Sequence, residues 1–284
     1  MDLRFLASDS LQGRLVLSSG SQRAQQYITQ HLTLAKLVPL YTAYQVPFDL
    51  SSDPEKGKGV NLIAKLEGED TTLANALLIS AHYDHIGTQS SGGEGADTIF
   101  NGANDNAVGS ALVLDLMKRF AKGPKPKRTV LFAWFDAEES GLLGSIALAQ
   151  RFKEEGKRLH AVINLEMLGV PMTDFPGQAY VSGYEKSTLP QVLNHYVDQP
   201  ILIQFKEESR YGVFSRSDNY PFYKLLAIPA HTICSFDFKN YNYYHKVGDE
   251  VDQVNLAFVR TMADNLFAML SGYANDLDHS VVLN

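Results

Sequence analysis

Carboxylate and imidazole side chains, which bind metal ions and move protons, stand at or just after the ends of apolar stretches in this sequence. Two more lie where a helix is expected to begin and in a late loop. In chain order these residues are His82, Asp84, Asp105, Asp136, Glu138, Glu139, Glu166 and His245. Mixed imidazole and carboxylate ligands fit zinc best, and manganese or cobalt accept similar donors.

Five of the acids would share one crevice if the apolar strands lie side by side. They are Asp84, Asp105, Glu138, Glu139 and Glu166. Like charges a few ångström apart force protonation, and divalent cations reverse this balance. One cation would leave most of the negative charge uncompensated, so two cations that share a bridging carboxylate suit the number of acids better.

The stretch that organises the expected fold is Thr129–Asp136. Mostly apolar, β-forming residues without polar alternation are typical of a central strand that is buried on both faces. Open α/β sheets build their sites at the carboxyl ends of such strands, where Asp136, Glu138 and Glu139 stand. The alternative is that these acids form the solvated first turn of a helix.

Further strands and helices alternate along the chain. We expect Ser21 to cap the first helix, and strands 60–66 and 76–82 to be neighbours. Residues 48–59 are expected to form a loop, and residues 87–102, with five glycines, a long loop of functional length. The other predicted strands cover residues 160–166, 179–182, 200–205 and 230–235; the other predicted helices cover residues 22–37, 140–155, 187–196, 220–226 and 252–273, with one more that ends near residue 122.

Composition narrows the class of protein. A chain of 284 residues that is 45% hydrophobic can bury a large core, and we expect one domain over residues 1–284. The net charge of −7 makes nucleic acid an unexpected partner. Cys234 is the only cysteine, so no internal disulfide can form. No apolar run reaches the roughly 20 residues of a membrane span, and the start of the chain lacks the pattern of a signal peptide.

Five blocks of the sequence resemble, in the same order, those of the co-catalytic zinc aminopeptidase family, which includes bacterial leucyl aminopeptidases and aminopeptidase Y. Glutamate carboxypeptidase and glutaminyl cyclase are more distant members of this group. The opening segment Leu6–Arg14 is also similar to the start of many members. The five blocks are Ala81–His85, Asn101–Gly109, Asp136–Ser145, Asn164–Gly169 and Tyr244–Asp249. The resemblance implies a three-layer α/β/α sandwich with a mixed, mostly parallel central sheet.

The resemblance also implies a ligand set for two zinc ions. Asp105 would bridge the metals. His82 and Glu166 would complete one site, and Glu139 and His245 would complete the other. Most aminopeptidase relatives have Asp where this chain has Glu166, and the extra methylene leaves open whether Glu166 binds through one oxygen or two.

Three further roles follow from the resemblance. Glu138 would be the general base, Asp84 would fix the orientation of the His82 imidazole, and Tyr244 would polarise the scissile carbonyl. The implied reaction is hydrolysis of the first peptide bond of a peptide with a free N-terminus. Relatives are often exported, which implies a secreted or periplasmic location. The oligomeric state is not indicated.

Rival functions stay open at this point. Glutaminyl cyclase uses the same scaffold with a single zinc, and the related domain of transferrin receptor is a non-catalytic binding module. All five ligand positions here hold side chains that can bind metal, which argues against the second rival. Carboxypeptidase action is a third alternative within the hydrolases.

Several residues have structural interpretations beside the functional ones. Asp105 could cap a helix, His82 could be an ordinary core histidine, and His85 is expected to hydrogen bond rather than to bind metal. Asp249 and Asp252 are expected to cap the last helix. Asp218 is either a helix cap or an acid near the substrate cleft. Aromatic residues of two loops could line an apolar pocket or merely pack together: Tyr211, Phe214, Phe236, Phe238, Tyr241 and Tyr243.

Overall fold

The computed structural model describes residues 2–90 and 96–284, so part of the expected 87–102 loop lies outside the described residues. Its helices are α1 (Asp2–Leu6), α2 (Ser19–Leu34), α3 (Val108–Lys122), α4 (Leu143–Glu154), α5 (Leu189–Asn194), α6 (Glu208–Tyr211), α7 (Asn219–Leu226) and α8 (Leu256–Ala274). Its strands are β1 (Val38–Pro39), β2 (Gln45–Asp49), β3 (Lys58–Leu66), β4 (Leu77–His82), β5 (Val130–Phe135), β6 (Ala161–Glu166), β7 (Ala179–Val181), β8 (Leu202–Gln204) and β9 (Ala230–Cys234). None of the helices within these ranges combines the length and apolarity that crossing a membrane requires.

The strands form one mixed sheet in the order β1-β3-β5-β4-β6-β9-β7-β8, with β2 paired to β3. The four central strands β5, β4, β6 and β9 are parallel, whereas β3 and β7 run antiparallel to their inner neighbours. The prediction for Thr129–Asp136 is confirmed, because every residue of β5 is buried and the strand has a neighbour on each side.

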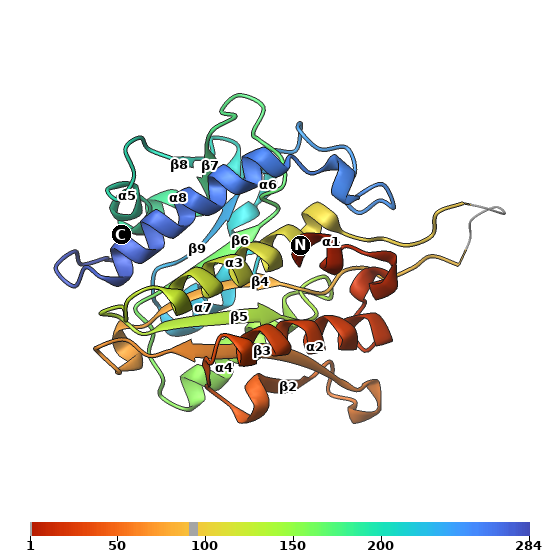
Figure 1. Cartoon of the computed structure of the whole chain (residues 1–284), viewed down its shortest axis with the longest axis horizontal. Helices are drawn as coiled ribbons and strands as arrows, with labels where there is room; N and C mark the ends of the chain where they lie inside the picture. Colours follow the sequence, from red (N-terminus) through yellow and green to blue (C-terminus); the bar gives the residue numbers. More distant parts are fainter. Residues whose placement is uncertain (1, 91–95) are drawn as a thin grey trace.

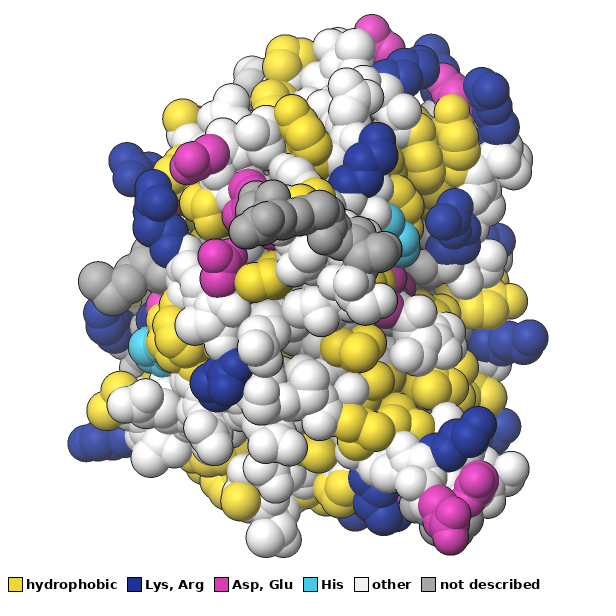
Figure 2. All heavy atoms as spheres, turned by 90° about the vertical axis from the view of Figure 1, so that its right-hand side faces the viewer, with side chains coloured by type: hydrophobic (Ala, Val, Ile, Leu, Met, Phe, Trp, Pro, Cys, Tyr) yellow, Lys and Arg dark blue, Asp and Glu magenta, His cyan; other side chains and the backbone are white. Residues whose placement is uncertain are grey.

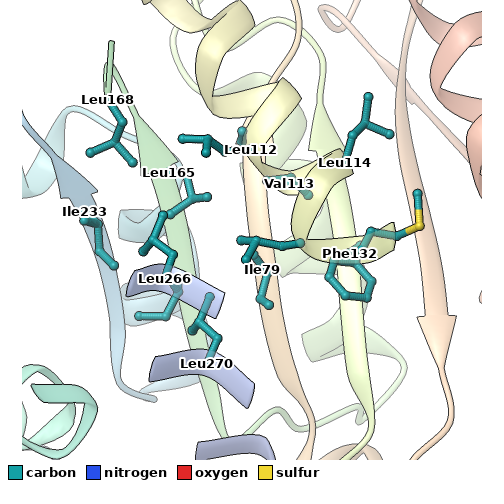
Figure 3. Close-up of a cluster of buried hydrophobic side chains, with 14 of the residues drawn as sticks. Ile79, Leu112, Val113, Leu114, Phe132, Leu165, Leu168, Ile233, Leu266 and Leu270 are labelled. Carbon is teal, nitrogen blue, oxygen red and sulfur yellow. The ribbon is translucent and has the colours of Figure 1, made fainter. Parts of the chain in front are cut away.

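Helices cover both faces of the sheet (Figure 1). Helices α2, α3 and α8 lie on one face, and α4 and α7 lie on the other. Strand residues alternate between two cores: Ile79 and Phe132 belong to the core beneath α3 and α8, whereas Leu78 and Leu131 belong to the core beneath α4 and α7. The first core is drawn in Figure 3, where side chains of α3 and α8 meet those of the central strands. The expected three-layer α/β/α sandwich is therefore confirmed. The first core includes both Leu3 and Val281, so we propose that residues 1–284 form one domain.

Three local predictions are wrong. Strands β3 and β4 are not neighbours, because the apolar strand β5 lies between them. Residues 48–59 are not all loop: β2 ends at Asp49, and β3 begins at Lys58. Pro47 sits in β2, which has only one partner strand, and an edge position tolerates a residue without an N–H. The cap of α2 is Ser18, which accepts a hydrogen bond from Ser21 N at 3.0 Å.

Candidate metal centre

Three parallel strands bring their terminal residues to the same level of the sheet. In the β4–β6 pairing Ser80 is aligned with Asn164, so His82 and Glu166 leave their strands side by side. On the other side of β4, His82 is aligned with Phe135, the last residue of β5. The acids that follow β5 therefore start next to His82. Figure 2 shows the molecule from the right-hand side of Figure 1, and acidic side chains are exposed around the middle of that face.

The first group of ligand atoms contains His82, Asp105 and Glu166. The His82 Nε2 atom lies 3.4 Å from Asp105 Oδ1 and 3.2 Å from Glu166 Oε1. Ligands bound to a tetrahedral zinc at about 2.0–2.1 Å lie about 3.3 Å from one another. The observed separations therefore fit three ligands around one ion.

The second group is built around Glu139. The His245 Nε2 atom lies 3.1 Å from both Asp105 Oδ2 and Glu139 Oε2. His85 approaches the other Glu139 oxygen, with Nδ1 2.7 Å from Oε1. The last distance is that of a hydrogen bond, as expected for His85, although its atoms are close enough to Asp105 and Glu139 for it to ligate a cation as well. His245 contacts both carboxylates, so we favour it as the ligand.

Buried positions make these charges costly without cations. Asp105 and His82 are almost fully buried, and the Glu166 and Glu139 side chains are only 13% and 10% exposed. Burial and nearby acids raise the pKa of Glu138 and Glu166, with His82 opposing both shifts. Hydrogen bonds to Asp105 and Glu139 raise the pKa of His245 to about 10. Two imidazoles among several carboxylates form a donor set that fits zinc.

Asp105 is positioned by segments from distant parts of the sequence. It lies in a short helical turn, Ala103–Ala107, that precedes α3. Asp249 accepts hydrogen bonds from the main-chain N–H groups of Asn104 at 2.7 Å and Asp105 at 3.0 Å. The Asn106 side chain donates to Leu165 O and accepts from Met167 N, which joins this turn to the end of β6. Both contacts hold Asp105 near Glu166.

Asp84 contacts both His82 and the acids after β5. Its carboxylate accepts hydrogen bonds from Glu138 N at 3.1 Å and Glu139 N at 3.3 Å. The His82 Nδ1 atom lies 3.2 Å from the Asp84 main-chain oxygen and 3.5 Å from a carboxylate oxygen. Asp84 therefore contacts the imidazole of His82 and positions the main chain of the two glutamates, and its role in orienting the imidazole stays a prediction.

The structure corrects three sequence interpretations. Asp249 does not cap the last helix, since its carboxylate supports the Asp105 turn, and Asp252 does not cap it either, because Asn255 accepts from Phe258 N. Asp136 does not line the cavity; it accepts a hydrogen bond from Val60 N at 3.0 Å. Of the two alternatives for Asp218, the helix cap is wrong, because Asp218 occupies the N-cap position of α7 without a capping hydrogen bond and its buried oxygens have no partner among the described residues. The alternative of an acid near the substrate cleft stays a prediction.

An open cavity of about 80 Å³ adjoins the two groups. Its walls beyond the candidate ligands are mainly apolar: Met167, Tyr180, Val213, Cys234, Phe236, Phe238 and Tyr244, with Ser182, Ser217, Thr232 and Arg216 among them. The other aromatic residues proposed from the sequence do not line the cavity: Tyr211, Phe214, Tyr241 and Tyr243. Tyr211 stacks on Phe238 with 3.9 Å between ring centroids.

Comparisons of the sequence find known relatives. The model of peptidase family M28 matches residues 61–270. A probable leucine aminopeptidase of Arthroderma otae is 25% identical over 209 residues, which are 70% of this chain and 52% of that protein. The chain thus spans about half the length of the curated relatives it matches.

Solved structures share the fold. The LapA aminopeptidase of Legionella pneumophila has a TM-score of 0.72 and 21% identity, over 98% of this chain and 71% of that chain. A glutaminyl cyclase of Porphyromonas gingivalis has a TM-score of 0.72 and 14% identity, over 95% and 96% of the two chains. At these identities the likeness concerns the fold alone. The family model covers well over half of the sequence, and this chain belongs to peptidase family M28.

Proposed function

We propose that this chain is an aminopeptidase with a co-catalytic pair of zinc ions and Glu138 as the general base. The position of Asp105 carries the proposal. Its Oδ1 atom faces His82 and its Oδ2 atom faces His245, at 3.4 and 3.1 Å. A carboxylate that offers one oxygen to each of two cations is suited to bridge them.

The ligand assignment follows from these contacts. His82, Glu166 and Asp105 would hold one ion, and His245, Glu139 and Asp105 would hold the other. Manganese or cobalt could replace zinc at these donors. Bound zinc supplies Lewis acidity, which makes water a nucleophile near neutral pH and polarises a carbonyl group.

Glu138 is suited to accept the proton of the attacking water. It lines the cavity beside the ligands but belongs to neither ligand group. Burial raises the pKa of Glu138, as do Asp218 and Glu166, and a carboxylate of raised pKa is a stronger base once ionised. The proton that Glu138 takes up can then pass to the amine that leaves.

Tyr244 is suited to donate a hydrogen bond to the carbonyl oxygen of the scissile bond. It lines the cavity, and its ring stacks on His245 with 4.0 Å between centroids. Burial and the nearby Asp105 and Glu139 raise the pKa of its hydroxyl. The phenol therefore keeps its proton at neutral pH and remains a donor.

The apolar cavity supports a preference for peptides with a large apolar N-terminal residue. Met167, Val213, Phe236 and Phe238 give it apolar walls, and Arg216, which also lines it, would repel a basic side chain. An apolar side chain would gain about 25 cal/mol for each Å² that it buries there.

Metal content and activity test the proposal together. The zinc-loaded protein should contain two ions per chain and hydrolyse a chromogenic leucine anilide, with loss of activity in chelator and recovery in zinc. An N-acetylated leucine anilide should not be hydrolysed. Glu138→Gln should lower kcat by about 10² to 10⁴-fold with both ions still bound. A Glu138→Gln protein of full activity would show that another group is the base.

Glutaminyl cyclase activity is the second candidate, because that solved structure covers 95% of this chain. It is a transferase reaction and its relatives are expected to use one zinc. One ion per chain, together with cyclisation of an N-terminal glutamine and no anilide hydrolysis, would favour this candidate. The contacts of His245 favour two ions. Its imidazole lies next to the carboxylates of both Asp105 and Glu139, and these three residues would hold a second ion.

A further inference from the structure

Arg14 is a fully buried arginine at the end of the turn Asp9–Arg14, in the opening segment whose role the proposed mechanism does not include. Only 1% of the residue is exposed. A buried guanidinium needs hydrogen-bond partners for its five N–H donors. The partners of Arg14 show what this residue holds in place.

All four hydrogen bonds of the Arg14 side chain go to main-chain carbonyl oxygens. Nε donates to Tyr83 O at 2.8 Å, Nη1 donates to Leu6 O and to Asn101 O at 2.6 Å, and Nη2 donates to Gly102 O at 3.1 Å. The guanidinium thus joins three segments that are far apart in sequence.

Two of these segments carry candidate metal-site residues. Tyr83 lies between His82 and Asp84, and Gly102 lies three residues before Asp105. Both segments lie outside the sheet, so their buried carbonyl oxygens need other donors. Arg14 donates to Tyr83 O and Asn101 O, and it adds a second donor to Gly102 O, which also accepts from Ala107 N at 3.0 Å. These bonds fix the separation of the two segments.

The main chain of the turn strengthens this connection. Gly13 O accepts a hydrogen bond from Gly87 N at 3.0 Å. Gly13 has a φ of +67°, and a Cβ atom there would lie 2.2 Å from Gly87 O. The close approach that lets Arg14 reach the segments near Asp84 and Asp105 therefore requires glycine at position 13.

The charge of Arg14 is directed at the same centre. Burial lowers the pKa of Arg14 to about 10, and four carboxylates oppose this shift: Asp249, Asp84, Asp105 and Glu139. The side chain stays charged at neutral pH. None of its hydrogen bonds goes to a carboxylate, so the charge offsets the acidic cluster as a whole rather than one partner.

We propose that Arg14 is a positioning residue of the metal centre, which joins the segments of Asp84 and Asp105 through their carbonyl oxygens and so sets the ligand geometry for two ions. This inference rests on the proposed two-metal function. Lysine cannot replace arginine here, because its donors sit on a single nitrogen and cannot reach four carbonyl oxygens around a planar fork.

Arg14→Lys is the test variant, and Arg128→Lys is its matched control. Arg128 is also buried, and it donates to the carbonyl oxygens of Tyr273 and Asp276 at the opposite end of β5. Zinc affinity is measured by competition with a chelator, and the ligand geometry is followed in the visible spectrum of the cobalt-loaded protein. Arg14→Lys should bind zinc about 10- to 100-fold more weakly and show an altered cobalt spectrum. Arg128→Lys should lose thermal stability but keep the zinc affinity and spectrum of the wild type.

Kinetics at saturating zinc add a second readout. Arg14→Lys should lower kcat with little change in KM, because the apolar cavity is built by other segments. Wild-type zinc affinity and spectrum in Arg14→Lys would overturn the inference without touching the proposed function. If the wild type bound two zinc ions but had no peptidase activity, the proposed function would be overturned. The zinc affinities of Arg14→Lys and the wild type would still decide whether Arg14 positions the metal centre.

If Arg14→Lys does not fold without metal, its refolding is measured against zinc concentration. Recovery of the fold at 10- to 100-fold more zinc than half-saturates the wild type supports the inference. Failure to fold at every zinc concentration would show a general structural role and overturn it.

Discussion

The two oxygens of Glu166 have different neighbours, and this decides how the residue can bind a cation. Oε1 lies 3.2 Å from His82 Nε2, whereas Oε2 accepts a hydrogen bond from Ser217 Oγ at 3.0 Å. The longer side chain is therefore held at both oxygens, and only Oε1 faces the ligand group. We propose that Glu166 binds metal through one oxygen.

Shortening Glu166 should weaken one metal site and spare the other. In Glu166→Asp the carboxylate is drawn back by one methylene, so it cannot contact both Ser217 and the ion beside His82. We expect zinc affinity to fall about tenfold in one step of a two-step titration, with the second step unchanged. Ser217→Ala, which removes only the hydrogen bond to Oε2, is the control and should cost less affinity. Equal affinities in the wild type and Glu166→Asp would refute single-oxygen binding.

At the residue scale, the candidate metal ligands could be predicted from the sequence, whereas the distant residues that hold them in place could not. The candidate ligands meet because each stands at a strand end, next to a helix start or in a loop beside that edge, and these positions are visible in the apolar pattern. Asp249 supports Asp105 from 144 residues away. No local pattern indicates such a contact, so Asp249 resembled a helix cap. For the same reason, no local pattern distinguishes Arg14 from the rest of the opening segment.

At the scale of elements, the strands with continuous apolar runs were predictable, and their order was not. Strands β4, β5 and β6 lie where expected, since runs that are buried on both faces differ from everything around them. Strand β2 was missed because Pro47 argues against a strand, although an edge tolerates it. Proximity in sequence suggested that β3 pairs with β4, but this rule is only a tendency and β5 takes that place.

The loop after β9 should set the preference for the N-terminal residue. Phe238 lines the cavity and is held there by its stacking on Tyr211. Phe238→Ala should lower kcat/KM for leucine and phenylalanine anilides by about tenfold, because an apolar wall is lost, and should leave alanine anilide nearly unaffected. Phe175→Ala removes a phenylalanine that is 45% exposed and outside the cavity, and it should change none of these values. A uniform loss across all three substrates in Phe238→Ala would instead indicate damage to the metal centre.

For the whole molecule, stability should depend on the pH through histidines that the fold buries in neutral form. His231 is fully buried in β9, with Nδ1 2.9 Å from Ser182 O and Nε2 2.6 Å from Ser187 Oγ. A carbonyl can only accept, so Nδ1 donates and Nε2 accepts, which satisfies the neutral ring. Burial lowers the pKa of His231 to about 4, and Lys186 adds to this shift.

The direction of the pH effect follows from the two states. The unfolded chain binds a proton at His231 below its ordinary pKa of about 6.5, and the folded protein does so only near 4. Between these values the unfolded state holds more protons, so the free energy of unfolding falls as the pH falls and is independent of this group above pH 7. From pH 7 to pH 5 the loss from His231 should be about 2 kcal/mol.

Chemical denaturation of His231→Gln at pH 7 and pH 5 checks this value. The variant loses buried hydrogen bonds and should be less stable at both pH values, but its stability should fall by about 2 kcal/mol less between them than that of the wild type. Titration of the acids and histidines of the metal centre is common to both proteins and cancels in the comparison. His195→Gln changes an exposed histidine and should keep the full wild-type pH dependence. If His231→Gln lost as much stability as the wild type between pH 7 and pH 5, the acid sensitivity of the fold would have to arise at other groups. His160 would then be substituted next, because it is half-buried and burial lowers its pKa to about 4 as well.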